Sequence, residues 1–162
     1  MSANKFIEHV YILPEDEQDE ELANGFVTHH TCTGRVDILK PAGGWHKALD
    51  ALKDVHAKEM RIRTKRYMVL LIDFDNDPSR REDAEKLVPD DLRDRVFLIG
   101  SLKEPRDLSN QLNLSRRRIG AKLAQECAEN SEETWNHDLL KHNANELARM
   151  RKSIRKIVFP EV

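Results

Sequence analysis

The segment that most limits the fold of this chain is YMVLLID, residues 67–73, which runs directly into Phe74-Asp75-Asn76-Asp77. Its apolar residues are continuous rather than alternating, as is typical of a strand covered on both faces. Such strands occur in parallel sheets flanked by helices, and ligands of these sheets bind at the carboxyl ends of the strands. The sequence therefore predicts a buried strand that delivers three aspartates to a ligand-binding edge.

Three further apolar runs also predict strands, because each is short, rich in β-forming residues and followed by polar, Gly or Pro residues. They are residues 6–13, 36–40 and 95–100. Helical patterns lie between the strands, at residues 16–29, 44–58 and 79–87. This alternation predicts an α/β fold with a mainly parallel, four-stranded, Rossmann-like sheet and helices on both faces.

The remainder of the chain predicts a helical C-terminal extension, about residues 106–162. Residues 107–128 predict two helices or one kinked helix, residues 131–152 predict another, and IRKIVF, residues 154–159, predicts a last edge strand. No repeat or long linker divides the 162 residues. We therefore expect a single domain, 1–162, with its core at about residues 6–105.

Charge and composition exclude little beyond a membrane protein. The net charge is −2, and acidic clusters coexist with basic ones, which suits either a metal site that meets a phosphate backbone or an ordinary solvated surface. Two cysteines without a CxxC motif predict neither a disulfide framework nor a zinc site. Because no apolar run reaches about 20 residues and no signal-like N-terminus is present, we expect a cytoplasmic protein with no membrane contact.

The aspartate cluster predicts a site for a divalent cation. Asp73, Asp75 and Asp77 would repel one another unless a cation or basic side chains compensated them, and clustered carboxylates suit Mg²⁺ or Mn²⁺. The alternative is a solvated turn in which Asp77 caps the helix after Pro78. A calcium-binding EF-hand loop is excluded, because Pro78 and Ala84 occupy the positions that require Gly and Glu.

Two other segments are expected near this cluster. Glu15 follows the first predicted strand and would face the aspartates if the first and third strands were neighbours, although an acid there also suits the start of a helix. Gly43 and Gly44 follow the second strand, where their backbone could approach a phosphate or simply form a turn. Lys47, in the next helical turn, could meet the same phosphate or remain a surface residue.

A carboxylate after the first strand, a glycine turn after the second and an aliphatic strand ending in DxD resemble the Toprim domain. That domain occurs in topoisomerases, DnaG-type primases, OLD-family nucleases and small stand-alone nuclease-like proteins. The resemblance covers about residues 6–105. It implies that Glu15 acts as general acid or base and that Asp73 and Asp75 hold Mg²⁺ or Mn²⁺, with Asp77 assisting, for phosphodiester transfer on nucleic acid, either DNA or RNA.

The chain departs from the family at two positions beside Glu15. Asp16 stands where the family has Gly, and Pro14 replaces an aliphatic residue, so Glu17 and Asp19 are alternative acids in this segment. Neither tyrosine is placed as a topoisomerase nucleophile, because both lie in predicted strands. The sequence is therefore most similar to the small stand-alone, OLD-like group, for which a separate ATPase or a second copy of the chain is a possible partner.

The sequence thus predicts a metal-dependent nuclease, with basic side chains as candidate phosphate contacts. These are Arg80, Arg81, Arg116, Arg117 and Arg118. Glu104 and Asp107, after the fourth strand, predict an additional metal ligand, a partner for Arg106, or a helix start. Two other functions stay open: a haloacid-dehalogenase-like phosphatase with Asp73 as nucleophile, and a non-catalytic Toprim-like binding module.

Overall fold

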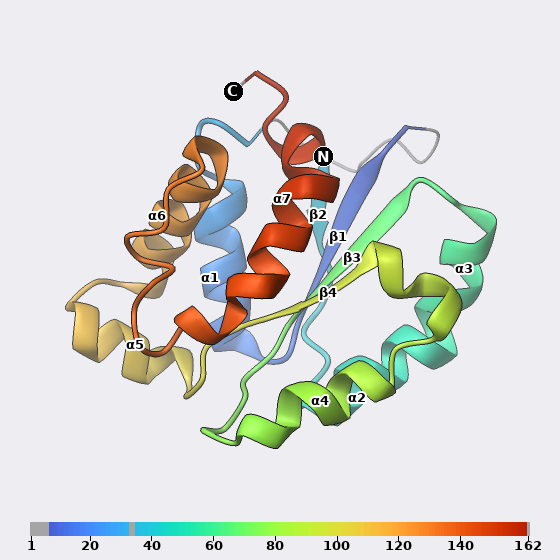
Figure 1. Ribbon diagram of the computed structural model, residues 1–162, viewed down its shortest axis with the longest axis horizontal. Coiled ribbons are helices and arrows are strands. Elements are labelled where there is room, and N and C mark those ends of the chain that lie inside the picture. The colour runs from blue at the N-terminus through green and yellow to red at the C-terminus, as the bar shows by residue number, and fades with distance from the viewer. Residues whose placement is uncertain (1–6, 33–34, 162) are drawn as a thin grey trace.

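The protein is an α/β structure built on a four-stranded, wholly parallel sheet (Figure 1). The computed structural model describes residues 7–32 and 35–161. The strands stand in the order β2-β1-β3-β4, so β1 and β3 are neighbours at the centre of the sheet. The strands are β1 (His9–Pro14), β2 (Val36–Ile38), β3 (Arg66–Leu71) and β4 (Val96–Ile99). All four predicted strands are confirmed, although residue 6 of the first lies outside the described residues.

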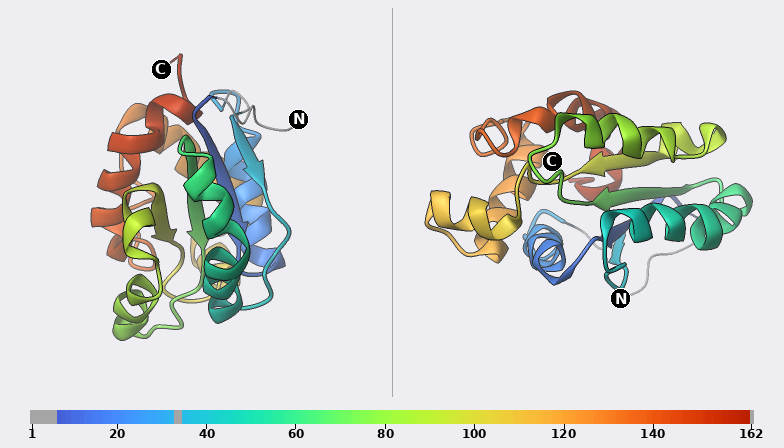
Figure 2. Two further views of the ribbon diagram at one scale, coloured as in Figure 1. Left: turned by 90° about the vertical axis from the view of Figure 1, so that its right-hand side faces the viewer. Right: turned by 90° about the horizontal axis from the view of Figure 1, so that it is seen from below.

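Helices cover both faces of the sheet, as the continuous apolar strands predicted (Figure 2). One layer contains α1 (Glu17–Val27), α6 (Arg116–Glu129) and α7 (Ala144–Val158). The other contains α2 (Trp45–Ala51), the π-helical turn η1 (Leu52–His56), α3 (Ala57–Ile62), α4 (Pro78–Lys86) and the 3₁₀ turn η2 (Asp90–Arg95). The remaining elements are α5 (Pro105–Leu112) and the 3₁₀ turn η3 (Lys141–Asn143).

Strand β3 shows why these runs are apolar throughout. Val69 and Leu71 pack into the core beneath α1, α6 and α7, whereas Met68, Leu70 and Ile72 pack into the core beneath α2, α3 and α4. Successive side chains of a strand point to opposite faces, so a strand between two helical layers needs an apolar residue at every position.

The C-terminal extension differs from the prediction in two places. Residues 107–128 do form two helices, α5 and α6, but the segment before η3 is irregular, and α7 begins only at Ala144. The predicted edge strand at 154–159 is wrong, because residues up to Val158 continue α7. Met150, Ile154 and Ile157 are buried at helical spacing against the sheet, and this packing outweighs the local β-propensity of IRKIVF. Within the described residues, no helix is long and apolar enough to cross a bilayer.

Helices α1 and α6 cross at two glycines, and this crossing fixes the helix that follows Glu15. A methyl group at Gly120 would lie 2.1 Å from the carbonyl oxygen of Leu22, and one at Gly25 would lie 2.0 Å from that of Arg117. Both obstacles are backbone atoms, which cannot turn aside as a side chain can. The two helices can therefore pack this closely only with glycine at both positions.

Gly120→Ala is accordingly expected to lower the free energy of unfolding by about 3 kcal/mol, the upper end of ordinary overpacking. Alanine favours a helix more than glycine does, so the loss would arise from the crossing alone. Chemical denaturation would measure the loss, with Gln125→Ala on the exposed side of α6 as the control. Equal stability of the two variants would contradict the close crossing.

Candidate functional site

Three carboxyl groups meet where β1 and β3 end. Glu15 directly follows β1, Asp73 lies two residues beyond β3, and Asp19 stands in the first turn of α1. One oxygen from each lies within 4.8 Å of the others. The pairing of β1 with β3, in which Pro14 lies opposite Leu71, brings the segments together. The expectation that Glu15 faces Asp73 across the carboxyl edge of the sheet is confirmed.

Local hydrogen bonds hold the Glu15 carboxyl group in place. The backbone N–H of Asp73 donates to Glu15 Oε2 at 2.6 Å, and the backbone N–H of Glu15 donates to the Leu71 carbonyl at 2.8 Å. Asp16 caps α1 by accepting from the backbone N–H of Asp19 at 3.1 Å, and its own backbone is extended. Asp16 therefore starts the helix without the backbone freedom of the Gly that the Toprim resemblance expects there.

Asp19 is the least solvated member of the cluster. It has no exposed surface, and neither of its carboxyl oxygens accepts a hydrogen bond from the described residues. Asp73 is also buried, and its Oδ1 likewise has no donor. Buried carboxylates are normally hydrogen-bonded or paired with a cation. Three carboxyl oxygens without a donor, two on Asp19 and one on Asp73, are the kind of ligands that a divalent cation binds.

The electrostatics of the cluster agree with this interpretation. Burial, followed by the negative charge of Glu15, raises the pKa of Asp73 to about 8. Burial, followed by the charge of Asp73, raises the pKa of Asp19 well above its ordinary value. Burial also raises the pKa of Glu15, although the Asp73 N–H opposes that shift. Without a cation, the three groups cannot all be ionised at neutral pH.

The glycine turn lies beside the acids, as predicted. The N–H of Gly43 donates to the Glu15 carbonyl at 2.7 Å, and Gly43 and Gly44 have φ values of +93° and +154°. A methyl group at Gly43 would lie 3.6 Å from Cδ of Lys47 and 3.9 Å from its Nζ. Lys47 is exposed, so the turn carries a cationic side chain at the rim of the site.

Arg80 is the basic residue closest to the acids by its contacts. Its Nη1 donates to the Asp73 carbonyl at 3.1 Å, its Nη2 lies 3.5 Å from Asp75 Oδ2, and its guanidinium lies 4.9 Å from the centre of the Trp45 ring. It also lowers the pKa of Glu15. Arg80 thus stands between the acid cluster and the exposed Asp75.

Asp75 and Asp77 do not join the cluster. Asp75 and Asn76 both have positive φ, 48° and 51°, so the chain turns sharply after Phe74 and leaves Asp75 exposed. Asp77 caps α4, accepting from the backbone N–H of Ser79 at 2.9 Å. The capping alternative for Asp77 is therefore confirmed, and Asp19 occupies the third place in the cluster.

The other predicted phosphate contacts lie elsewhere. Arg81 donates to the Leu98 carbonyl and to Asn143 Oδ1, at 2.8 and 2.6 Å, and these bonds tie α4 to β4 and η3. Arg116 forms an ion pair with Glu21 on α1 at 2.6 Å. Arg117 and Arg118 are exposed at the start of α6. Of the predicted basic side chains, Arg80 and Lys47 are those that the structure brings to the site.

The loop after β4 completes the surroundings of Asp73. Glu104 contributes to the raised pKa of Asp73, and it forms an ion pair with Arg106 at 3.1 Å, as one of the sequence alternatives proposed. Ser101 is fully buried, and its Oγ has no partner among the described residues.

Sequence reasoning gave Asp19 too small a role. The sequence offered Asp19 only as an alternative to Glu15, whereas both residues lie in the cluster with Asp73. A signal was present: Asp19 lies on the same helical stripe as Leu22, Ala23 and Phe26, which pack into the core. A carboxylate on an apolar stripe must be buried, and it then needs a partner.

Comparison with family models, curated proteins and solved structures finds no match for this chain. Any statement of function therefore depends on the geometry and chemistry of the site itself.

Proposed function

We propose that this protein is a nuclease or related phosphodiester-transfer enzyme of the Toprim type, acting on nucleic acid with Mg²⁺ or Mn²⁺. The observation that carries the proposal is the fully buried Asp19, whose two oxygens have no donor and lie beside Asp73 and Glu15. The cluster lies at the carboxyl edge of a parallel sheet, where such folds bind their ligands.

Asp19 and Asp73 would hold the cation, since both oxygens of Asp19 and Oδ1 of Asp73 have no hydrogen-bond donor among the described residues. A bound divalent cation would neutralise charge on the phosphate under attack and lower the pKa of a water molecule. Glu15 is partly exposed and has a raised pKa, which suits it to accept or donate a proton near neutral pH. These roles require no side chain beyond those that the structure brings together.

Arg80 and Lys47 supply the positive charge that a phosphodiester substrate needs. The ion pair between Arg80 and Asp75 is long, 3.5 Å from Nη2 to Oδ2, and the Asp75 carboxylate is largely exposed. A phosphate oxygen could replace that carboxylate and form a shorter, charge-assisted bond with the same guanidinium. Lys47 lies beside the glycine turn, whose Gly43 N–H donates to the Glu15 carbonyl. Substrate binding should therefore weaken as salt concentration rises.

Wild-type protein is expected to bind Mn²⁺ and to cleave nucleic acid only when Mg²⁺ or Mn²⁺ is present. Calorimetric titration would measure binding, and incubation with supercoiled plasmid and with single-stranded DNA and RNA would measure cleavage, with EDTA as the control. Cleavage in EDTA would contradict the metal-dependent mechanism. Metal binding without cleavage of any polynucleotide would contradict the enzymatic proposal and favour a binding module.

A further inference from the structure

In the part of the chain that the structure describes, the outer edge of β4 has no neighbouring strand, and side chains bind its backbone groups instead. The N–H of Leu98 donates to Glu146 Oε2 at 2.8 Å, and the Leu98 carbonyl accepts from Arg81 Nη1 at 2.8 Å. Arg149 Nη2 donates to the Val96 carbonyl at 3.2 Å. Side chains of α7 and of α4 therefore bind this edge of β4 as an additional strand would.

Asn143, at the end of η3, is the central residue of this arrangement. It has no exposed surface, and its side chain makes four hydrogen bonds. Oδ1 accepts from Arg81 Nη2 at 2.6 Å and from the Gly100 N–H at 3.3 Å. Nδ2 donates to the carbonyls of Gly100 and Leu140, both at 2.9 Å. One amide thus joins α4, the end of β4 and η3.

The segment that Asn143 holds is the one on which the Asp73 loop rests. Backbone N–H groups of Ile72, Phe74 and Asn76 donate to the carbonyls of Ile99, Ser101 and Leu102 at 2.9, 3.1 and 2.5 Å. These bonds continue the pairing of β3 with β4 past the ends of both strands. Asp73 lies between two residues that are tied to this segment, and its own N–H is bound to Glu15.

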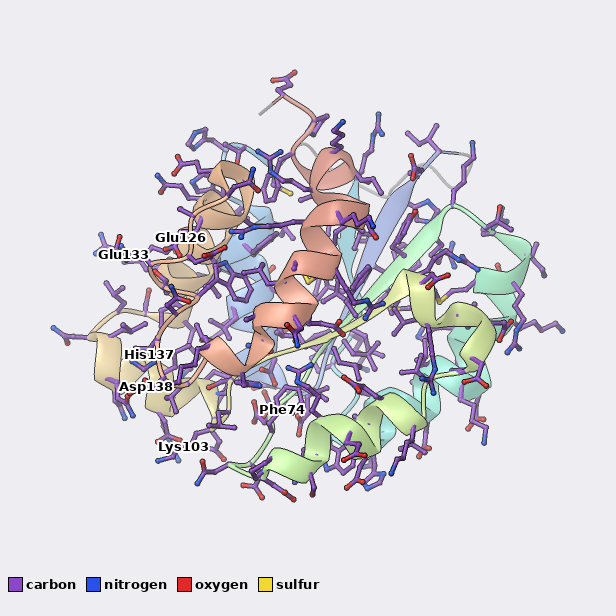
Figure 3. All side chains as sticks on the ribbon, viewed as in Figure 1. Phe74, Lys103, Glu126, Glu133, His137 and Asp138 are labelled. Atoms are coloured by element: carbon purple, nitrogen blue, oxygen red, sulfur yellow. The ribbon has the colours of Figure 1, made fainter. Side chains whose placement is uncertain are left out.

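Phe74 connects the same two parts through its ring. The ring centre lies 4.5 Å from the guanidinium of Arg81 and 4.8 Å from the ring of His142, which packs edge-on. His142 Nε2 lies 2.9 Å from the Gly100 carbonyl. Figure 3 labels Phe74 at the edge of the sheet where the loops after β3 and β4 meet. Arg81 and η3 therefore hold Phe74, the residue next to Asp73, from two sides.

We propose that Asn143 is a positioning residue for the candidate metal site. It fixes the Gly100–Leu102 segment, and that segment holds Asp73 at the distance from Glu15 and Asp19 that a shared cation requires. The inference rests on the proposed function, because it assigns Asn143 a role in cation binding. It also makes the C-terminal extension a working part of the site rather than an addition to the sheet.

Asn143→Ala is expected to weaken Mn²⁺ binding about tenfold or more, as losses of supporting hydrogen bonds around metal ligands do. Calorimetric titration with Mn²⁺ alone, at a temperature where every variant is folded, would measure the dissociation constant. Hydrogen exchange of the Phe74 and Asn76 amides would report the loop directly and should become faster. Asn143→Asp keeps the size of the side chain and the bonds that Oδ1 accepts from Arg81 and the Gly100 N–H. It loses the two that Nδ2 donates to carbonyls, so it should weaken binding, but less than alanine does.

Met60→Ala is the matched control, because Met60 is fully buried in α3, in the core on the opposite face of the sheet. It should lower the melting temperature and leave the dissociation constant within about twofold of wild type, since distant sites act independently. Equal Mn²⁺ affinity in wild type and Asn143→Ala would overturn the positioning role alone. Failure of wild type itself to bind Mn²⁺ would overturn the proposed function, and this inference with it.

Discussion

In the absence of divalent cations, the protein should lose stability as the pH rises from about 4 to about 8. Asp73 has its pKa raised from 3.8 to about 8 in the folded state, and the pKa of Asp19 and of Glu15 is raised as well. At these three carboxyl groups the folded state therefore binds more protons than the unfolded state across this range. His142, whose pKa burial lowers from 6.5 to about 4, acts in the opposite direction below about pH 6.5, so the decline should be steepest between pH 6.5 and 8. Stability is full below the unfolded pKa and declines by about 1.4 kcal/mol per pH unit for each extra proton.

Added Mg²⁺ or Mn²⁺ should flatten this decline, because a cation stabilises the ionised carboxylates that the folded state otherwise disfavours. Thermal unfolding at pH 5, 6.5 and 8, with and without added cation, would measure both effects. Stability that rises with pH in the metal-free protein would contradict the orphaned carboxylates at this site.

Asp19→Asn tests the same electrostatics by substitution. At pH 8 without cation, the variant should be more stable than wild type by about 1 kcal/mol, or roughly 2–4 °C in melting temperature. The amide keeps the shape of the side chain, removes a carboxyl group that ionises more readily in the unfolded state, and can donate to the Asp73 carboxylate. The variant should gain little from added cation. Asp54→Asn, an exposed position in η1, serves as the control and should change neither property.

The sheet was predictable from sequence because burial on both faces leaves a strong local signal. Strand β4 and the part of β3 from Met68 on are apolar at every position, and each run ends at a polar or glycine residue. The order β2-β1-β3-β4 is not written in any one segment, and the sequence left the adjacency of β1 and β3 as the condition under which Glu15 would face the aspartates. The position of Glu15 relative to Asp73 therefore followed from topology.

The irregular segment before α7 was not predictable, because distant groups hold it. The buried Glu126 of α6 accepts from the backbone N–H groups of Thr134 and Trp135, at 2.7 and 3.3 Å. These bonds replace the helical bonds that residues 131–143 would otherwise make. The apolar residues near Trp135 have helical spacing. Nothing in the sequence indicates that the Glu126 carboxylate binds the backbone of Thr134, eight residues later.

A count of charges does not tell which basic residues of a helix are free to bind a ligand. Helix α7 carries five basic residues, which are Arg149, Arg151, Lys152, Arg155 and Lys156. Arg151 donates to the carbonyls of Glu126 and Ser131 at 2.9 and 2.5 Å, and Arg155 donates to that of Ala128 at 3.0 Å. These cations bind the carboxyl end of α6, where the helix dipole favours positive charge. They contribute to packing of α7 on α6. Lys152 and Lys156 of the same helix, by contrast, remain exposed.

The DxDxD spacing misled for a different reason. Carboxylates two residues apart would face one way if the chain stayed extended, but Asp75 and Asn76 adopt left-handed backbone conformations. Aspartate and asparagine tolerate this conformation better than most residues, so no glycine marks the turn in the sequence. Only Asp73, before the turn, remains with the acids that β1 and α1 supply.

Two aspartates four residues apart should consequently behave very differently when each is replaced by asparagine. Asp73→Asn removes a carboxylate that would hold the cation, and loss of several kcal/mol of transition-state stabilisation corresponds to a fall of at least about 100-fold in cleavage rate. Asp77→Asn leaves a residue that caps a helix equally well, so the rate and the melting temperature should stay close to wild type. Both variants should remain folded, which circular dichroism would verify before single-turnover cleavage is compared. If the two substitutions reduced the rate alike, the cation would lie over the exposed turn rather than among Glu15, Asp19 and Asp73, and the geometry on which the proposed function depends would be wrong.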